Sequence, residues 1–270
     1  MWASLISLVS LGGFAAATCI GNTHLERRSE GGEAFGYGFD NGPLRWHALS
    51  PANSICATGK HQSPIDVDSH IQNAPKALNI RLTDRLSGTF VNKGTTLQVT
   101  TAANSSQYID LSGTRYNLKN VHFHTPSEHH LAGEHFPLEM HLVHQSANES
   151  LLVLGLLFNI VASAQQSGGL LKQLGDYAPR LTSEGVDITE KELDLGSLVK
   201  DLLPEDLGRY SGSLTTPPCS ESVMWLVARK PRNIDVASYD KLKKTMKFNS
   251  RFAAGPPDSD NIVHMLANKL

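Results

Sequence analysis

The chain has 270 residues, and its 24 lysines and arginines nearly balance 26 aspartates and glutamates, so charge gives no reason to expect nucleic acid or an anionic membrane as a partner. With 40% hydrophobic and 19% charged residues, the composition is that of a globular protein and not of a disordered chain. Histidine is the unusual residue, because seven of the 12 lie between His122 and His144.

The first 17 residues have the pattern of a secretory signal peptide, in which a short apolar run is followed by three alanines suited to cleavage. Arg27-Arg28 is a candidate processing site that would make 18–28 a propeptide; an ordinary solvated charge pair is the alternative. No stretch approaches the roughly 18 to 20 apolar residues that span a bilayer, so we expect no membrane anchor. The sequence predicts a secreted, extracellular protein with one domain at 29–270.

Secretion changes what the cysteines and some asparagines can do. Cys19 lies beside the predicted cleavage region, which leaves Cys56 and Cys219 as partners for one disulfide across a very long loop. Two buried thiols are the alternative. Asn104 and Asn148 each begin an Asn-x-Ser sequon and are therefore candidate glycosylation sites in a secreted protein.

Strand patterns outnumber helical patterns along this domain. Two hairpins are expected at the turns 92–94 and 112–114, since each turn contains a glycine, for which a positive φ is easy. Alternation at 138–144 and a nearly continuous apolar run at 151–158 indicate two further strands. The segments expected to be extended are 89–91, 96–100, 108–111, 116–118, 138–144, 151–158 and 223–228.

Helical spacing of apolar residues is limited to three segments. These are 167–174, then 197–203, which Pro204 stops, and 236–246, for which Asp235 is a candidate N-cap. The fold class that follows is mainly β (α+β), a single domain with one large, mostly antiparallel central sheet and short peripheral helices.

The clustered histidines fall on two of the predicted strands. His122 and His124 are two residues apart, so a strand places both imidazoles on one face. In the second strand Glu139 and His141 share a face. If the strands are neighbours, three neutral imidazoles converge on one cation, and three histidines with a water form the tetrahedral set of an open zinc site. Histidines hydrogen-bonded within a core are the alternative.

Two neighbouring features bear on this site. Glu139 is placed to accept the distal N–H of His141, which would fix the tautomer of a metal ligand. Residues 210–219 form a hydroxyl-rich segment that two prolines stiffen, and we expect it to be a loop. His129, His130 and His135 lie in a polar connection and are expected to be solvated.

Together these residues resemble an alpha-class carbonic anhydrase of the secreted, eukaryotic type. The resemblance covers about residues 35 to 251 in the expected order. The motifs that carry it are Tyr37-Gly38, Asn41-Gly42-Pro43, Trp46, Gln62-Ser63-Pro64-Ile65-Asp66, Val121-His122-Phe123-His124, Ser127-Glu128-His129, Glu139-Met140-His141-Leu142-Val143-His144, Val153-Leu154-Gly155, Ser213-Leu214-Thr215-Thr216-Pro217-Pro218 and Trp225.

The resemblance implies a large twisted sheet with Zn²⁺ at the base of a conical cavity, bound by His122, His124 and His141. It implies reversible hydration of carbon dioxide to bicarbonate and a proton, by attack of a zinc-held hydroxide. Glu128 and Thr215 match a gatekeeper pair, in which the carboxylate accepts the hydroxyl proton of Thr215 and so orients that hydroxide.

Other positions match the family's substrate pocket and the surroundings of its metal. Carbon dioxide is uncharged, so its pocket should be mostly apolar. The resemblance implies that Asn120 binds the ring of His122 and that Tyr37 belongs to the water network of the active site. The residues matching the substrate pocket are Val143, Val153, Leu214, Thr216, Val223 and Trp225.

One position departs from the family. Fast members carry a histidine after the Asn-x-Gly turn, and it passes the proton between the zinc water and buffer. Here Asn92-Lys93-Gly94 is followed by Thr95, which does not titrate near neutral pH. The sequence therefore predicts that proton release limits turnover and depends on buffer.

Two other functions compete with an active carbonic anhydrase. One is a catalytically weak or inactive carbonic-anhydrase-related binding domain, against which the presence of all three candidate ligands argues. The other is a cupin-like oxygenase with iron on an H-x-H pair, against which Glu128 and the Thr-Thr-Pro-Pro segment argue.

Overall fold

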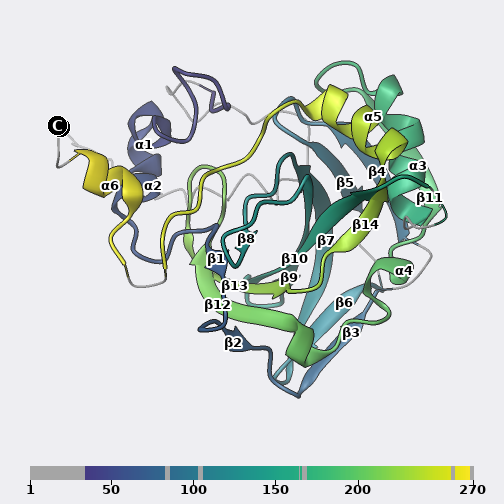
Figure 1. The fold of residues 1–270 in the computed structure, drawn as a ribbon, viewed down its shortest axis with the longest axis horizontal. Helices are drawn as coiled ribbons and strands as arrows, with labels where there is room; N and C mark the ends of the chain where they lie inside the picture. Colours follow the sequence, from purple (N-terminus) through teal and green to yellow (C-terminus); the bar gives the residue numbers. More distant parts are fainter. Residues whose placement is uncertain are drawn as a thin grey trace, which may run out of the picture.

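A large mixed β-sheet lies at the centre of the computed structural model (Figure 1). The structure describes residues 34–82, 86–102, 106–163, 165, 169–256 and 259–267. The predicted signal peptide, the predicted propeptide and Asn104 lie outside these residues.

The strands of the main sheet come from almost the whole described chain. Their bounds are β2 (Gln72–Asn73), β3 (Leu78–Arg81), β4 (Leu86–Asn92), β5 (Leu97–Thr101), β6 (Tyr108–Leu111), β7 (Thr114–His124), β9 (Leu138–Ser146), β10 (Leu151–Val161), β11 (Asp187–Leu193), β12 (Leu207–Ser213), β13 (Glu221–Ala228) and β14 (Arg232–Asp235). A separate parallel pair joins β1 (Asp66–Val67) to β8 (His130–Leu131).

Nine strands of the described sheet follow one path, in the order β11-β4-β5-β7-β9-β10-β13-β12-β2. β6 joins this path at β7 and carries β3, and β14 pairs with β10. Within the described part of this sheet, all pairings are antiparallel except those of β10 with β13 and with β14. The predicted single domain with a mostly antiparallel sheet is confirmed, and each predicted strand lies within or overlaps an observed one.

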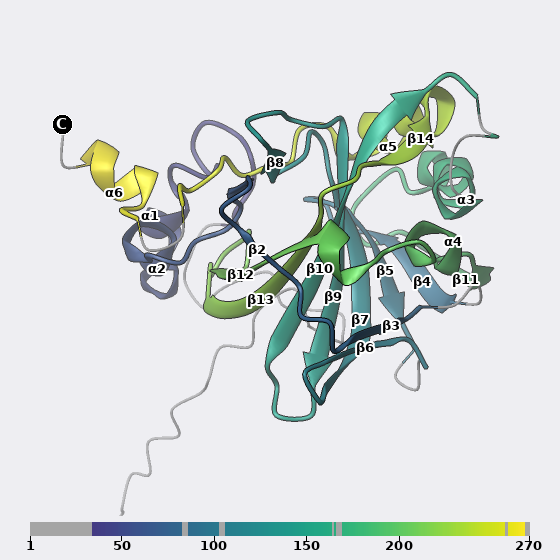
Figure 2. The ribbon, with the colours of Figure 1, turned by 60° about the horizontal axis from the view of Figure 1, so that its bottom comes forward.

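The helices are short and gather at two ends of the sheet. α1, α2 and α6 lie at one end, while α3 and α5 lie together at the other (Figures 1 and 2). Among the described residues, no helix has the length and apolar character needed to cross a membrane. The helices are α1 (Trp46–Leu49), α2 (Ile55–Thr58), α3 (Gly169–Tyr177), α4 (Gly196–Val199), α5 (Val236–Met246) and α6 (Ile262–Ala267), with 3-10 turns at Pro51–Asn53, Ala178–Arg180 and Pro204–Asp206.

Of the predicted helices, one is confirmed and one is too long. The prediction for 236–246 is confirmed, and the carboxylate of Asp235 caps the helix by accepting the Ser238 N–H at 3.0 Å. The prediction for 197–203 is too long, because α4 ends at Val199. Leu203 precedes a proline and is extended (φ −102°, ψ 154°), as the ring of Pro204 requires of its neighbour.

A β-bulge in β7 decides which residues face the histidine cluster. The register of β7 against β9 shifts by one residue between Leu118 and Asn120. Leu118 and, beyond the bulge, Val121 and Phe123 therefore all pack into the main core. Asn120, His122 and His124 consequently share the opposite face.

Candidate metal centre

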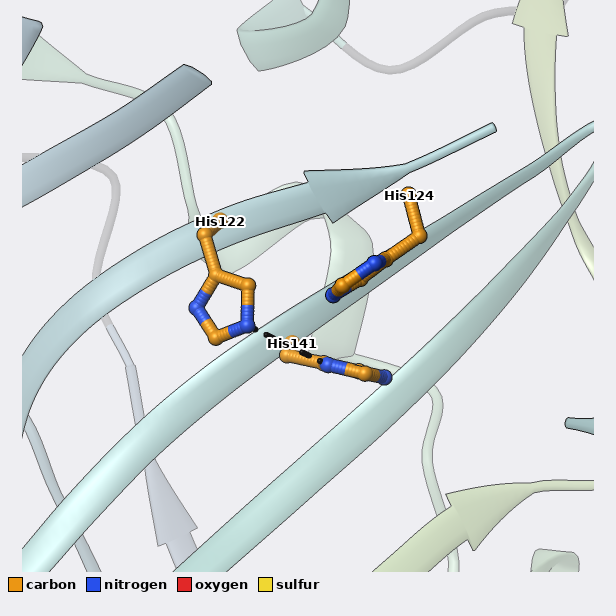
Figure 3. A group of neighbouring side chains, drawn as sticks. All are labelled: His122, His124 and His141. Atoms are coloured by element: carbon orange, nitrogen blue, oxygen red, sulfur yellow. Dashed lines mark hydrogen bonds between the residues drawn. The ribbon is translucent and has the colours of Figure 1, made fainter. Parts of the chain in front are cut away.

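Three histidine side chains from two neighbouring strands converge on one point (Figure 3). His122 of β7 lies directly opposite His141 of β9, and His124 follows two residues along β7. The ring centroids are 4.6 to 5.2 Å apart, and all three side chains are buried. One ligand nitrogen from each ring lies within 4.8 Å of the others.

Each ring is held by a hydrogen bond on its outer nitrogen. Nδ1 of His122 lies 3.0 Å from Oδ1 of Asn120, and Nδ1 of His124 lies 2.8 Å from the carbonyl oxygen of Asn249. Nε2 of His141 lies 2.7 Å from Oε1 of Glu139. These acceptors require N–H on the outer nitrogens, which leaves the inner nitrogens with lone pairs.

The inner nitrogens fit a bound cation. Nδ1 of His141 and Nε2 of His122 are 3.3 Å apart, and the buried Nε2 of His124 has no hydrogen-bond partner among the described residues. A buried polar atom without a partner needs an explanation, and a metal ion would accept its lone pair. Burial lowers the pKa of all three imidazoles, to about 4 for His124, and so favours the neutral form that binds metal.

Glu139 is the most heavily hydrogen-bonded carboxylate beside the cluster. Its Oε2 accepts the backbone N–H groups of Glu128 and His129, both at 2.8 Å. Its Oε1 accepts from the rings of His129 at 2.6 Å and His141 at 2.7 Å. Burial alone would raise the Glu139 pKa, but the two imidazoles outweigh it and hold that pKa well below its usual range.

The expectation that His129 is solvated is wrong. Its side chain is fully buried, with Nε2 at 2.7 Å from the hydroxyl of Tyr210 and the ring 4.7 Å from that of Trp225. The segment after β7 folds back onto the sheet, because its backbone N–H groups bind Glu139. His129, Glu139 and His141 form a second close group, but hydrogen bonds among them already use the facing atoms.

Glu128 lies at the edge of the three-histidine cluster. Its Oε1 accepts the backbone N–H of Arg251 at 2.9 Å, and its Oε2 lies 4.0 Å from Nδ1 of His141. Burial raises the Glu128 pKa to about 7, and the nearby His141 and the Thr215 hydroxyl oppose this rise. Oε2 nonetheless makes no hydrogen bond of ordinary geometry with a described residue.

The predicted pocket residues lie together on the histidine side of the sheet. Val143, Val153, Leu214, Val223 and Trp225 belong to one buried cluster, which is distinct from the main core. The Trp225 ring lies 4.8 Å from that of His141, and its Nε1–H donates to the carbonyl of Ser213 at 2.9 Å. Thr216, the remaining predicted pocket residue, is half-buried in the adjoining segment.

The segment 210–219 is only partly a loop. Tyr210 to Ser213 belong to β12, and the prediction of a loop is wrong for them. Cys219 forms a disulfide with Cys56, 163 positions away, which confirms the predicted pairing. This bond ties α2 to the segment that carries Thr215 and Thr216.

The remaining predicted residues lie in other segments of the chain. Tyr37 is half-buried and packs edge-on against Trp46, with 5.6 Å between the ring centroids. Thr95 is half-buried in the turn between β4 and β5. Asn148 is exposed in the turn between β9 and β10.

Asn249 and Arg251 shape the centre, although the sequence patterns did not mark them. The Asn249 amide donates to the carbonyls of Thr95 at 3.0 Å and Phe123 at 2.8 Å. The buried guanidinium of Arg251 donates to the carbonyl oxygens of Ser63 at 2.7 Å and Cys56 at 3.0 Å. No periodicity marks either residue, because the partners are more than 120 positions away.

Comparison with known proteins agrees with this geometry. The family model for eukaryotic-type carbonic anhydrase matches residues 41–262. A carbonic anhydrase of Pectobacterium carotovorum is 32% identical over 234 residues, which are 85% of this chain and 90% of that protein. One of Neisseria gonorrhoeae is 31% identical over 243 residues, covering 89% and 88%. The structure of a fungal alpha carbonic anhydrase from Aspergillus oryzae superposes with a TM-score of 0.80 at 37% identity, covering 87% of this chain and 99% of that one.

Proposed function

Because this chain belongs to the eukaryotic-type carbonic anhydrase family, we propose that it hydrates carbon dioxide reversibly to bicarbonate and a proton, with Zn²⁺ held by His122, His124 and His141. The observation that carries this proposal is the convergence of three inner ring nitrogens, one of which is buried and has no hydrogen-bond partner in the described part of the chain. Zinc, when bound, makes hydroxide available near neutral pH by lowering the pKa of water, for which carbonic anhydrase is the standard example.

Three outer partners prepare the rings for this role. Asn120, the Asn249 carbonyl and Glu139 each accept an N–H from the far side of one imidazole. These hydrogen bonds select the tautomer whose lone pair faces inward, so the site needs little rearrangement to bind a metal. Glu139 also carries a charge that strengthens its hydrogen bond to His141.

Glu128 and Thr215 are proposed to orient the nucleophile. An ionised Glu128 accepts a hydrogen bond from the hydroxyl of Thr215, so the Thr215 oxygen presents only lone pairs to the site. It then accepts a hydrogen bond from the attacking hydroxide and directs that oxygen toward carbon dioxide. Two observations support the pairing: Thr215 affects the Glu128 pKa, and Oε2 of Glu128 is free of other hydrogen bonds among the described residues.

The apolar cluster beside the histidines suits an uncharged substrate. Val143, Val153, Leu214, Val223 and Trp225 offer hydrocarbon surface next to the ring of His141. Carbon dioxide has no charge to desolvate, so these side chains can hold it without polar partners. Thr216 is proposed to contact the bicarbonate product, and Tyr37 to join the water network.

Proton release is proposed to depend on buffer. Thr95 occupies the position of the family's proton-shuttle histidine, and its hydroxyl exchanges no proton near pH 7. A small buffer base must then carry the proton away from the site in each turnover.

The protein is proposed to be secreted after loss of residues 1–17, and a second cleavage after Arg28 is proposed at the dibasic pair. The disulfide supports this proposal, because such bonds persist mainly in oxidising compartments. Asn148 is exposed in a turn, which supports its glycosylation. Glycosylation of Asn104 is proposed from its sequon alone.

Metal analysis and stopped-flow hydration of carbon dioxide test the function. We expect one zinc ion in the three-histidine site and rapid hydration for the wild-type protein, with both lost in His141→Ala. A folded wild-type protein without zinc and without activity would instead show a carbonic-anhydrase-related binding domain. Iron in place of zinc would indicate an oxygenase.

A further inference from the structure

A small hairpin next to the metal centre carries two histidines that the proposed reaction does not use. β8 turns back through Ala132 and Gly133, both with positive φ, and Leu131 pairs with Glu134 in antiparallel fashion. The next opposed positions are His130 and His135, which therefore share one face of the hairpin. Their ring centroids are only 3.9 Å apart.

Asp66, on the neighbouring strand, adds a carboxylate beside the two histidines, so that the three residues form a row across adjacent backbone segments. Asp66 of β1 pairs with His130 of β8 in the parallel pair, and Figure 1 shows the two strands side by side. Oδ1 of Asp66 accepts the backbone N–H of Gly133 at 3.0 Å, which holds the carboxylate against the hairpin. Asp66, His130 and His135 thus come from three adjacent backbone segments.

The ring nitrogens in this row are prepared for a ligand. Nδ1 of His135 lies 3.2 Å from the carbonyl of Ser127, so it carries the proton and leaves a lone pair on Nε2. Nε2 of His130 is buried and has no hydrogen-bond partner among the described residues. Burial, with His135 nearby, also lowers the pKa of His130 and keeps this ring neutral at pH 7.

We propose that His130 and His135 form a second metal site, which binds a divalent transition-metal ion such as Zn²⁺ or Cu²⁺ with Asp66 as the third ligand. Two imidazoles and a carboxylate suit these ions, whereas Mg²⁺ and Ca²⁺ prefer oxygen ligands. The rings need to separate by about 1 Å to match the spacing of the three-histidine cluster. His135 is exposed and can make this movement by rotating its side chain. The ligand atoms of Asp66, His130 and His135 do not all lie within 4.8 Å of one another, so the Asp66 carboxylate must also turn toward the rings when the ion binds.

The site has a structural consequence for the catalytic loop. Ser127 closes the base of the hairpin, because its N–H donates to the carbonyl of Phe136 at 2.7 Å. Glu128 and His129 follow directly in this loop. A metal ion bridging His130 and His135 therefore clamps the segment that presents the proposed gatekeeper.

Equilibrium dialysis of the full protein against buffered Zn²⁺, followed by metal analysis, tests the proposal. We expect two zinc ions per chain for the wild type and one for His135→Gln, whose second-site affinity falls at least about tenfold. His264→Gln removes another exposed histidine and should retain two. Carbon dioxide hydration of His135→Gln at low zinc should equal that of the wild type, which shows that the first site is intact.

Electron paramagnetic resonance of Cu²⁺, added to protein that holds one zinc ion per chain, identifies the ligands of the second site. We expect coupling to two imidazole nitrogens in the wild type, to one in His130→Gln or His135→Gln, and a changed spectrum in Asp66→Asn. A wild-type chain that binds only one zinc ion, or a His130→Gln/His135→Gln double variant with the wild-type stoichiometry and copper spectrum, would overturn the proposal.

Discussion

Replacement of Glu139 by glutamine would test how the protein holds its metal ligands. The two carboxylate oxygens accept four N–H donors, two from backbone and two from the rings of His129 and His141. Glutamine keeps one acceptor oxygen and replaces the other with an NH₂ group. In either orientation of the amide, two of the four N–H donors then face the NH₂ group and lose their acceptor.

The loss can be estimated from these contacts. A buried donor left without an acceptor costs about 1–3 kcal/mol, so two of them lower the free energy of unfolding by about 2–6 kcal/mol. This is a large part of the roughly 5–15 kcal/mol that stabilises a typical domain. Loss of the partner that orients His141 should also weaken zinc binding by about 10- to 100-fold.

Two measurements separate these effects. Urea denaturation of the zinc-free protein gives the change in unfolding free energy, and competition with a zinc chelator gives the affinity. Glu134→Gln removes an exposed carboxylate from the same loop and should change neither value appreciably. If Glu139→Gln matched the wild type in both experiments, the carboxylate would not be positioning His141, and the reasoning would fail.

Three further predictions follow from other parts of the molecule. Introducing a titratable group by Thr95→His should raise turnover in dilute buffer, toward the ~10²–10⁴-fold that a positioned proton-transfer group contributes, and an unchanged buffer dependence in stopped-flow assays would contradict this. Reduction of the Cys56–Cys219 disulfide should lower the free energy of unfolding by about 2–5 kcal/mol in urea titrations with and without reductant; equal midpoints would exclude such a contribution. Burial lowers the pKa of His144 to about 4 from its ordinary 6.5, so its contribution to stability is complete above pH 6.5 and is lost as pH falls toward 4. The zinc-free wild type should therefore lose about 3 kcal/mol more over this range than His144→Gln, whereas parallel pH profiles would show that His144 is not responsible.

Local patterns predicted the central strands, because their side chains either alternate between apolar and polar or are continuously apolar. β12 was missed, since Leu207 is the only aliphatic residue in a segment rich in glycine and serine. It is a strand because β13 supplies backbone partners along its length. β11 was also missed, because acidic and basic residues interrupt its apolar pattern. It is a strand because it pairs with β4 at the edge of the sheet.

The site was predictable where spacing within a strand sets the geometry, as for His122, His124 and His141. It was not predictable where burial depends on contacts across the chain. His129 lies in a segment with polar neighbours, and only the return of the loop onto Glu139 and Tyr210 removes it from water. The neighbouring residues in the sequence therefore do not indicate whether His129 is exposed or buried.

Asn249 explains why substitution at Thr95 is a clean test of the proton path. The Asn249 side-chain amide donates to the backbone carbonyl of Thr95, and the backbone carbonyl of Asn249 accepts from Nδ1 of His124. A new side chain at position 95 leaves both hydrogen bonds in place, because neither involves the threonine hydroxyl. Thr95→His should therefore change proton transfer without changing zinc affinity. A gain in buffer-independent turnover at constant zinc affinity would locate the limitation in the proton path, while a parallel change in both would show that the turn and His124 are mechanically coupled through Asn249.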